Sequence, residues 1–132
     1  MIKSAEEFCK LRNSELTEEY TRAATEEAPI EVWHEVIEKF PDMKMWVIHN
    51  KTVPEEILRQ LSDDPDSSVR SRVADKRKCP KDILIKLSRD QDSSVRLRVA
   101  YNAQTTLDIL KELANDSCED VVEIAARRLS SK

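Results

Sequence analysis

The chain has 132 residues, of which 36% are charged and 5% aromatic, and its formal net charge is −4. A chain of this length forms one domain and buries about two-thirds of the surface that its unfolded form exposes, so it needs neither a metal nor a disulfide to fold. It has no glycine, which excludes Gly-rich phosphate loops and disfavours the tight hairpin turns of β-sheets. The composition therefore predicts an all-α protein.

Residues 1–28 are expected to form two short helices that either cap a repeat or are a degraded copy of it. Ser4 and Glu7 have the spacing of a capping box, in which the serine accepts from the amide of the third helical residue and the glutamate accepts from the serine's own amide. A helix with Phe8 on its apolar side should follow. A second helix should begin at about Thr17.

From residue 29 onwards one pattern recurs about every 26 residues, so that Pro54 corresponds to Pro80 and Val69 to Val95. Proline suits the first turn of a helix because its missing N–H has no partner there, and each copy reads as helix, short turn, helix. A fixed period in this range indicates a solenoid of stacked helical units. The expected repeats are residues 29–53, 54–79, 80–105 and 106–132.

Two further features are expected to mark the ends of the second helix in each unit. Asp64, Asp90 and Asp116 recur just before it, where a carboxylate can accept from free helix amides, and Pro65 is expected at its first position. Asn50, Lys76 and Asn102 follow it, and asparagine commonly fills a left-handed position after a helix when glycine is absent.

The shared pattern P-x-x-[IL]-L-x-x-L-x-x-D-x-D-x-x-VR-x-x-VA occurs at Pro54–Ala74 and Pro80–Ala100, and more weakly from Thr106 to Ala126. It resembles the leucine-rich-repeat variant family and the wider HEAT-like group. The resemblance implies a right-handed α-solenoid of about four to five helix-turn-helix units, which serves as a binding scaffold and whose second helices line a curved surface. Some members of these families hold iron and sulfur in an N-terminal cysteine cluster. This chain has only Cys9 there, so no cofactor is expected.

The second helices separate core positions from a candidate binding face. With Val69 at 0° and 100° per residue, Val73 and Ala74 and their copies form recurring core columns, whereas the opposite columns differ between copies. Those outward columns, in which Ile124 also falls, hold aromatic residues and arginine, the types enriched at binding hot spots. The predicted partner-binding residues are Met45, Trp46, His49, Arg72, Asp75, Leu97, Arg98 and Tyr101. The alternative is that neighbouring helices cover part of this face.

Three other prominent residues are interpreted as structural. Arg70 and Arg96 recur near the periodic aspartates, so a ladder of ion pairs between neighbouring units is expected rather than a ligand site. Trp33 corresponds to core leucines of the later units and is expected to be buried.

The charge is unevenly distributed, and it separates the hypotheses about partners. Residues 1–42 carry 5 basic and 11 acidic side chains, whereas residues 70–98 carry 10 basic and 4 acidic ones. The leading hypothesis is a non-catalytic protein–protein interaction module, with an immunity or inhibitor protein that binds a basic partner as a more specific variant. One alternative is nucleic-acid binding through residues 70–98. The other is a structural solenoid that self-associates through its C-terminal repeat by Val122, Ile124 and Leu129.

No catalytic, cofactor or metal site is expected. The two histidines, His34 and His49, have no cysteine or carboxylate at metal-ligand spacing, and no membrane-spanning or signal segment is recognisable, so a cytoplasmic protein is expected. Cys118 lies near a helix N-terminus, a location that lowers the pKa of a thiol, so a reactive thiol is a minor hypothesis.

Overall fold

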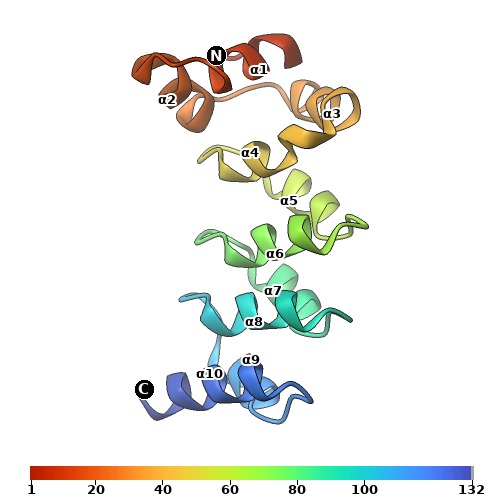
Figure 1. Cartoon of the computed structure of the whole chain (residues 1–132), viewed down its shortest axis with the longest axis vertical. Helices are drawn as coiled ribbons and strands as arrows, with labels where there is room; N and C mark the ends of the chain where they lie inside the picture. The colour runs from red at the N-terminus through yellow and green to blue at the C-terminus, as the bar shows by residue number, and fades with distance from the viewer. Residues whose placement is uncertain (132) are drawn as a thin grey trace. The chain divides into compact units, whose positions relative to one another are not determined.

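The computed structural model describes residues 1–131 and is entirely helical over that range, with ten α-helices, one 3-10 helix and no strand (Figure 1). The prediction of an all-α fold is confirmed. The chain divides into two compact units, Met1–Gln60 (unit 1) and Leu61–Lys132 (unit 2). The expectation of one continuous repeat domain over residues 1–132 stays a prediction.

Unit 1 is built from five helical elements and most of a sixth. They are α1 (Ala5–Arg12), α2 (Thr17–Thr25), α3 (Ile30–Lys39), the 3-10 helix η1 (Pro41–Met43), α4 (Lys44–His49) and α5 (Glu55–Leu61). Helix α1 packs against α2 and α3, and α4 packs against α2 and α3 (Figure 1). Unit 1 therefore brings α1 and α2 against α3 and α4, the two helices of the first expected repeat (residues 29–53).

Aromatic packing holds the core of unit 1. Phe8 of α1 meets Trp33 of α3 edge to face, with 5.2 Å between the ring centroids and 81° between the planes, and both side chains are fully buried. Such a pair contributes about 0.5–1.5 kcal/mol beyond the burial of its area. The prediction that Trp33 belongs to the core is confirmed.

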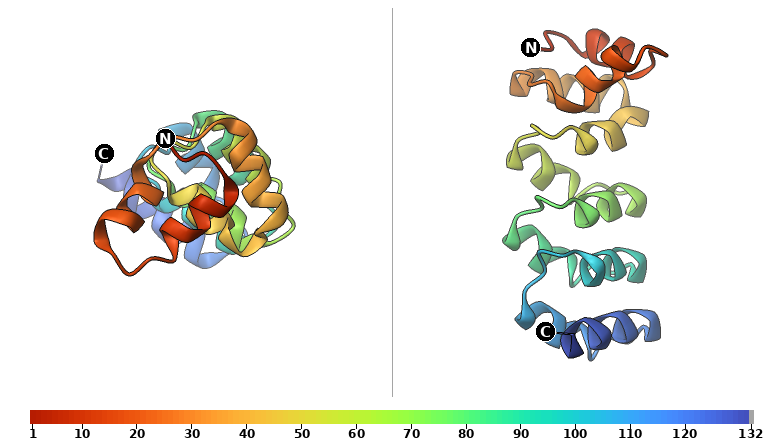
Figure 2. Two further views of the ribbon diagram at one scale, coloured as in Figure 1. Left: turned by 90° about the horizontal axis from the view of Figure 1, so that it is seen from above. Right: turned by 90° about the vertical axis from the view of Figure 1, so that its left-hand side faces the viewer.

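Unit 2 contains α6 (Ser67–Asp75), α7 (Lys81–Leu87), α8 (Ser93–Tyr101), α9 (Leu107–Leu113) and α10 (Glu119–Ser130). Helix α8 lies between α6 and α10, as both views show (Figures 1 and 2). Helix α7 contacts α6 and α8, and α9 contacts α8 and α10. The repeating side chains Val69, Val95 and Val121 are buried at corresponding places, which confirms this core column.

The buried face changes in the last helix. Ala74 and Ala100 are fully buried, but their counterpart Ala126 is exposed, and Ile124 is buried with 8% of its surface accessible. Helix α6 packs against α8, and α8 packs against α10, whereas no helix follows α10 within residues 1–131. The prediction that Ile124 faces outwards is therefore wrong.

The second helices of unit 2 begin two residues later than expected. The caps are Asp66 and Asp92, whose carboxylates accept from Ser68 N at 2.8 Å and Ser94 N at 2.9 Å. Pro65 precedes the helix and is not part of it. The recurring aspartates two residues earlier have another role: Asp64, Asp90 and Asp116 each accept from the amide two residues ahead, at 3.0, 2.9 and 2.8 Å.

The residues that follow the second helices are extended rather than left-handed. No residue between 1 and 131 has a positive φ, and Asn102 has φ −64° and ψ 126°. Its side-chain amide instead donates to Ala74 O at 2.7 Å and to Lys76 O at 2.9 Å, and Asn50 donates in the same way to Ala23 O and Glu26 O. These asparagines satisfy carbonyls at the end of the preceding second helix, which lack partners within that helix.

The first helix is capped nearly as expected. Ser4 Oγ accepts from Glu7 N at 3.0 Å, while Glu7 reaches back to Lys3 N at 2.9 Å rather than to the amide of Ser4. The serine's bond is where a standard capping box places it, and the glutamate's bond falls one residue earlier.

Candidate partner-binding surfaces

Two arginines of unit 2 form ion pairs and hydrogen bonds that hold the fold together. Arg70 Nε and Nη2 donate to the Asp90 carboxylate at 2.8 and 3.2 Å, and its Nη1 donates to Asp64 O at 2.7 Å. Arg96 has the same arrangement one repeat later. Its Nε and Nη2 donate to the Asp116 carboxylate at 2.8 and 3.1 Å, and its Nη1 donates to Asp90 O at 2.7 Å. The predicted ladder of ion pairs between neighbouring repeats is confirmed for the repeats of unit 2.

The ladder is electrostatically coupled as well as geometrically matched. Burial disfavours the charged form of Asp116, but the hydrogen bonds from Arg96 and from Cys118 N outweigh it and hold the pKa of that carboxyl below its usual value. The side chains of Arg96 and Asp116 expose only 14% and 9% of their surface. Such a two-point contact has both strength and a fixed orientation, so it sets the register between α8 and the turn before α10.

Arg72 and Arg98 lie two positions after the ladder arginines and behave differently. Both side chains are exposed, and within residues 1–131 neither forms a hydrogen bond or an ion pair with another protein group. Tyr101, one turn after Arg98 on α8, has 51% of its surface exposed. Leu97 is half-buried and Asp75 is exposed. We call Arg72, Asp75, Leu97, Arg98 and Tyr101 the α6–α8 surface.

The remaining predicted partner-binding residues lie in unit 1, on α4. Met45 and Trp46 are half-buried and His49 is exposed. The Arg12 guanidinium lies over the Trp46 ring, 3.4 Å from its centroid, and His49 meets the same ring edge to face at 5.7 Å. The alternative that a neighbouring helix covers part of the predicted face is therefore what the structure shows at Trp46.

An open pocket of about 400 Å³ adjoins this tryptophan (the Trp46 pocket). It is lined by Arg12, Tyr20, Thr21, Ala23, Ala24, Thr25, Trp46, His49 and Lys51. Arg12 and the α2 residues were not predicted. Arg12 precedes the recurring pattern, so no period in the sequence relates it to Trp46.

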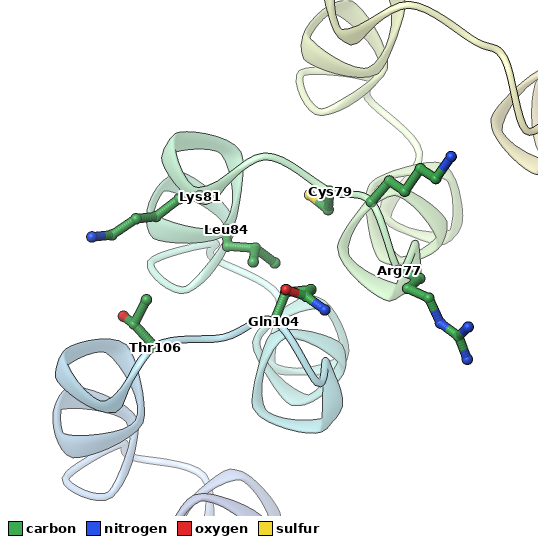
Figure 3. Close-up of a pocket in the computed structure, with 7 residues that line it drawn as sticks. Arg77, Cys79, Lys81, Leu84, Gln104 and Thr106 are labelled. Atoms are coloured by element: carbon green, nitrogen blue, oxygen red, sulfur yellow. The ribbon is translucent and has the colours of Figure 1, made fainter.

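A second pocket of about 470 Å³ lies between the loop before α7, α7 itself and the loop before α9 (Figure 3). Leu84 and Gln104 point into it, whereas the charged ends of Arg77 and Lys81 point away from it (Figure 3). Burial raises the pKa of Cys79 at its edge to about 12. Because their charged ends point away from the pocket, Arg77 and Lys81 do not converge on a single anion position.

Much of the basic segment is also neutralised. Besides the ladder arginines, Lys86 pairs with Asp63 and Arg89 pairs with Glu112 at 3.1 Å. These charges are used between neighbouring helices or turns of unit 2, so residues 70–98 present less free positive charge than the sequence indicates.

No three histidine, cysteine or acidic side chains gather into a metal-binding group in the described part of the chain. Among the same residues, no helix has the length and apolar character that a membrane span requires. Comparison with protein-family models, curated proteins and solved structures found no match.

Proposed function

We propose that this chain is a non-catalytic protein-interaction module of the HEAT-like α-solenoid class, which binds a protein partner through the α6–α8 surface. The 26-residue period and the packing of α8 between α6 and α10 support the assignment to that class. Because residues two apart on a helix point about 200° apart, each V-R-x-R segment divides its arginines between the fold and the surface.

One observation carries the proposal: within residues 1–131, Arg72 and Arg98 have no hydrogen-bond or ion-pair partner, although Arg70 and Arg96 are each held by a carboxylate and a backbone carbonyl. An unpaired arginine beside an exposed tyrosine combines free donors with large contact area. These residue types dominate measured binding hot spots. The α6–α8 surface thus offers two charged anchors and one aromatic anchor on adjoining helices.

The acidic segment of residues 1–42 adds a preference for basic partners. Its 5 basic and 11 acidic side chains would accelerate the encounter with a positively charged protein, as in an immunity or inhibitor protein that blocks a basic toxin. This more specific role rests on charge alone.

The alternatives have less support. Arg70, Lys86, Arg89 and Arg96 are ion-paired, which weakens the case for nucleic-acid binding through residues 70–98. Self-association through the C-terminal repeat loses one of its three apolar residues, because Ile124 is buried.

The proposal can be tested by site-specific photo-crosslinking in the native cell. A photoreactive residue replaces Tyr101, and in a matched control it replaces Leu107, which is exposed to a similar degree (46%) on α9. We expect a defined protein adduct from position 101 and none from position 107. Equal adduct patterns at both positions, or an adduct at 107 only, would contradict the proposal.

A further inference from the structure

The Trp46 pocket has the chemistry of an anion site with an apolar wall. Its described lining includes the cations Arg12 and Lys51 and no acidic residue, although unit 1 as a whole carries 8 basic and 13 acidic side chains. The described lining of the pocket is thus basic within a unit of net negative charge. The apolar part of the wall consists of Ala23, Ala24 and the ring of Trp46.

Arg12 is held in place but its hydrogen-bonding capacity is unused. Its guanidinium stacks on Trp46 at 3.4 Å, its Nε is buried without a partner, and it forms no ion pair within residues 1–131. The contact with the ring fixes the orientation of the guanidinium, and because Nε is buried, the two Nη groups are the ones that can form parallel bonds to a carboxylate or phosphate. Because the orientation is already fixed, less conformational entropy is lost when an anion binds.

The volume of the Trp46 pocket limits the kinds of anion that it can hold. A volume of about 400 Å³ far exceeds that of a bare inorganic ion and falls within the range of sites for small organic molecules. Tyr20 and Trp46 border this space and can contact an apolar or planar body. The surrounding negative charge of unit 1 disfavours a polyanion such as nucleic acid.

We infer that the Trp46 pocket binds a small organic anion, with its carboxylate or phosphate group on Arg12 and Lys51 and its apolar body against Trp46 and the α2 alanines. This site is separate from the α6–α8 surface, and its ligand is of a different class. Either assignment can fail without the other.

The test follows the indole N–H signal of Trp46 by NMR, assigned with Trp46→Phe, during titration with benzoate, phenyl phosphate and the neutral isostere benzamide. We expect dissociation constants on the order of millimolar for at least one anion, as suits ligands of so few atoms. Benzamide should bind at least about tenfold more weakly. The relative affinities of the two anions separate a carboxylate site from a phosphate site.

Variants distinguish a binding arginine from one that merely covers Trp46. Arg12→Gln and Lys51→Gln should each weaken anion binding about tenfold, while Lys10→Gln, the same charge change on the exposed side of the last turn of α1, should leave it within about twofold. Circular dichroism and thermal unfolding establish that each variant is folded. Equal binding of benzamide and both anions, or unchanged anion binding in the Lys51→Gln and Arg12→Gln proteins, would overturn the inference.

Discussion

Arginine residues only two positions apart have opposite roles in this protein. Arg96 is held by Asp116 and the carbonyl of Asp90, while Arg98 is exposed and unpaired within the described residues. The difference comes from helix geometry rather than from residue type. A charge run therefore says little about binding until its paired and unpaired members are separated.

Glu26 provides a pH-dependent reporter of local structure in unit 1. The hydrogen bond from Arg22 at 2.6 Å and the ion pair with the Met1 amino group lower the pKa of this carboxyl to about 2. Because the folded-state pKa is depressed, its stabilising contribution is complete above the unfolded value of about 4.3 and is lost as the pH falls towards 2.

We expect the NMR titration of Glu26 to show this low pKa and Arg22→Gln to raise it. Arg59→Gln, which alters an exposed residue outside this cluster, serves as the control and should leave the Glu26 titration unchanged. An unshifted Glu26 titration in the Arg22→Gln protein would show that the pair does not persist in solution.

The three cysteines are expected to differ in reactivity because of burial. The Cys79 thiol is buried, and its pKa of about 12 leaves on the order of a thousandfold less thiolate than an ordinary cysteine has at neutral pH. Cys9 and Cys118 are both half-buried. Partial burial and the nearby carboxylates of Asp42 and Glu6 raise the pKa of the Cys9 thiol.

Timed iodoacetamide labelling with mass spectrometry should therefore give the order Cys118, Cys9, Cys79 from fastest to slowest. Burial is enough to make Cys79 slow, so a difference between Cys118 and Cys79 says nothing about a special reactivity of Cys118. The informative comparison is with Cys9, which is half-buried like Cys118. Equal rates at Cys118 and Cys9 would remove the reactive-thiol hypothesis.

At the scale of helices, the turns of unit 2 depend on side chains that reach between successive layers. Asn102 and Arg128, 26 residues apart, both donate to carbonyls at the end of the preceding second helix, at Ala74 O and Ala100 O respectively. Together with the arginine–aspartate ladder, these bonds link each layer of unit 2 to the next. The helices are too short to be stable alone, so the links matter.

Breaking one rung of the ladder should destabilise the protein measurably. Arg96→Ala leaves the largely buried Asp116 carboxylate without its ion-pair partner, and we expect a loss of about 3 kcal/mol in the free energy of unfolding. Arg98→Ala removes the same side chain from an exposed, unpaired position and should change stability by less than about 0.5 kcal/mol. Urea denaturation at neutral pH gives both values.

The ladder also predicts a pH dependence. Since the pKa of Asp116 is depressed in the folded state, its contribution is present above about pH 4 and declines as the pH falls through the folded value. The difference in stability between parent and Asp116→Asn should therefore shrink on acidification. A constant difference, or similar costs for Arg96→Ala and Arg98→Ala, would show that the ladder is not stabilising.

How far the sequence predicts the structure depends on whether a feature is periodic. The core columns and the ladder follow from the 26-residue period, because packing demands recur with each layer. The sequence places the cap at Asp64 rather than Asp66 because both are good cap residues, and only the backbone decides between them. Similarly, the absence of glycine favoured left-handed asparagines, whereas Asn102 uses its side chain instead.

The contact between Arg12 and Trp46 in unit 1 does not follow from the period. Arg12 is separated from Trp46 by 34 positions and has no repeat counterpart, so only the folded chain reveals their contact. For the same reason the sequence predicts an outward-facing Trp46, whereas the structure has it half-buried under the Arg12 guanidinium. Sequence patterns identified the tryptophan but not its neighbour.

At the scale of the whole molecule, charge is divided between the two units. Unit 1 carries 8 basic and 13 acidic side chains, and unit 2 carries 14 and 13. A basic protein partner would be attracted mainly by unit 1, so its association rate should fall with rising salt more than its dissociation rate changes. Anchoring residues, by contrast, act chiefly on dissociation.

The most direct test of protein binding by the α6–α8 surface is calorimetry with the partner captured at position 101. We compare Arg98→Ala and Tyr101→Ala with Lys111→Ala, a control at an exposed residue of α9. The account predicts affinities at least about 30-fold weaker for the first two, as for hot-spot residues, and within about twofold of the parent for the control. Unchanged affinity in folded Arg98→Ala and Tyr101→Ala proteins would contradict it.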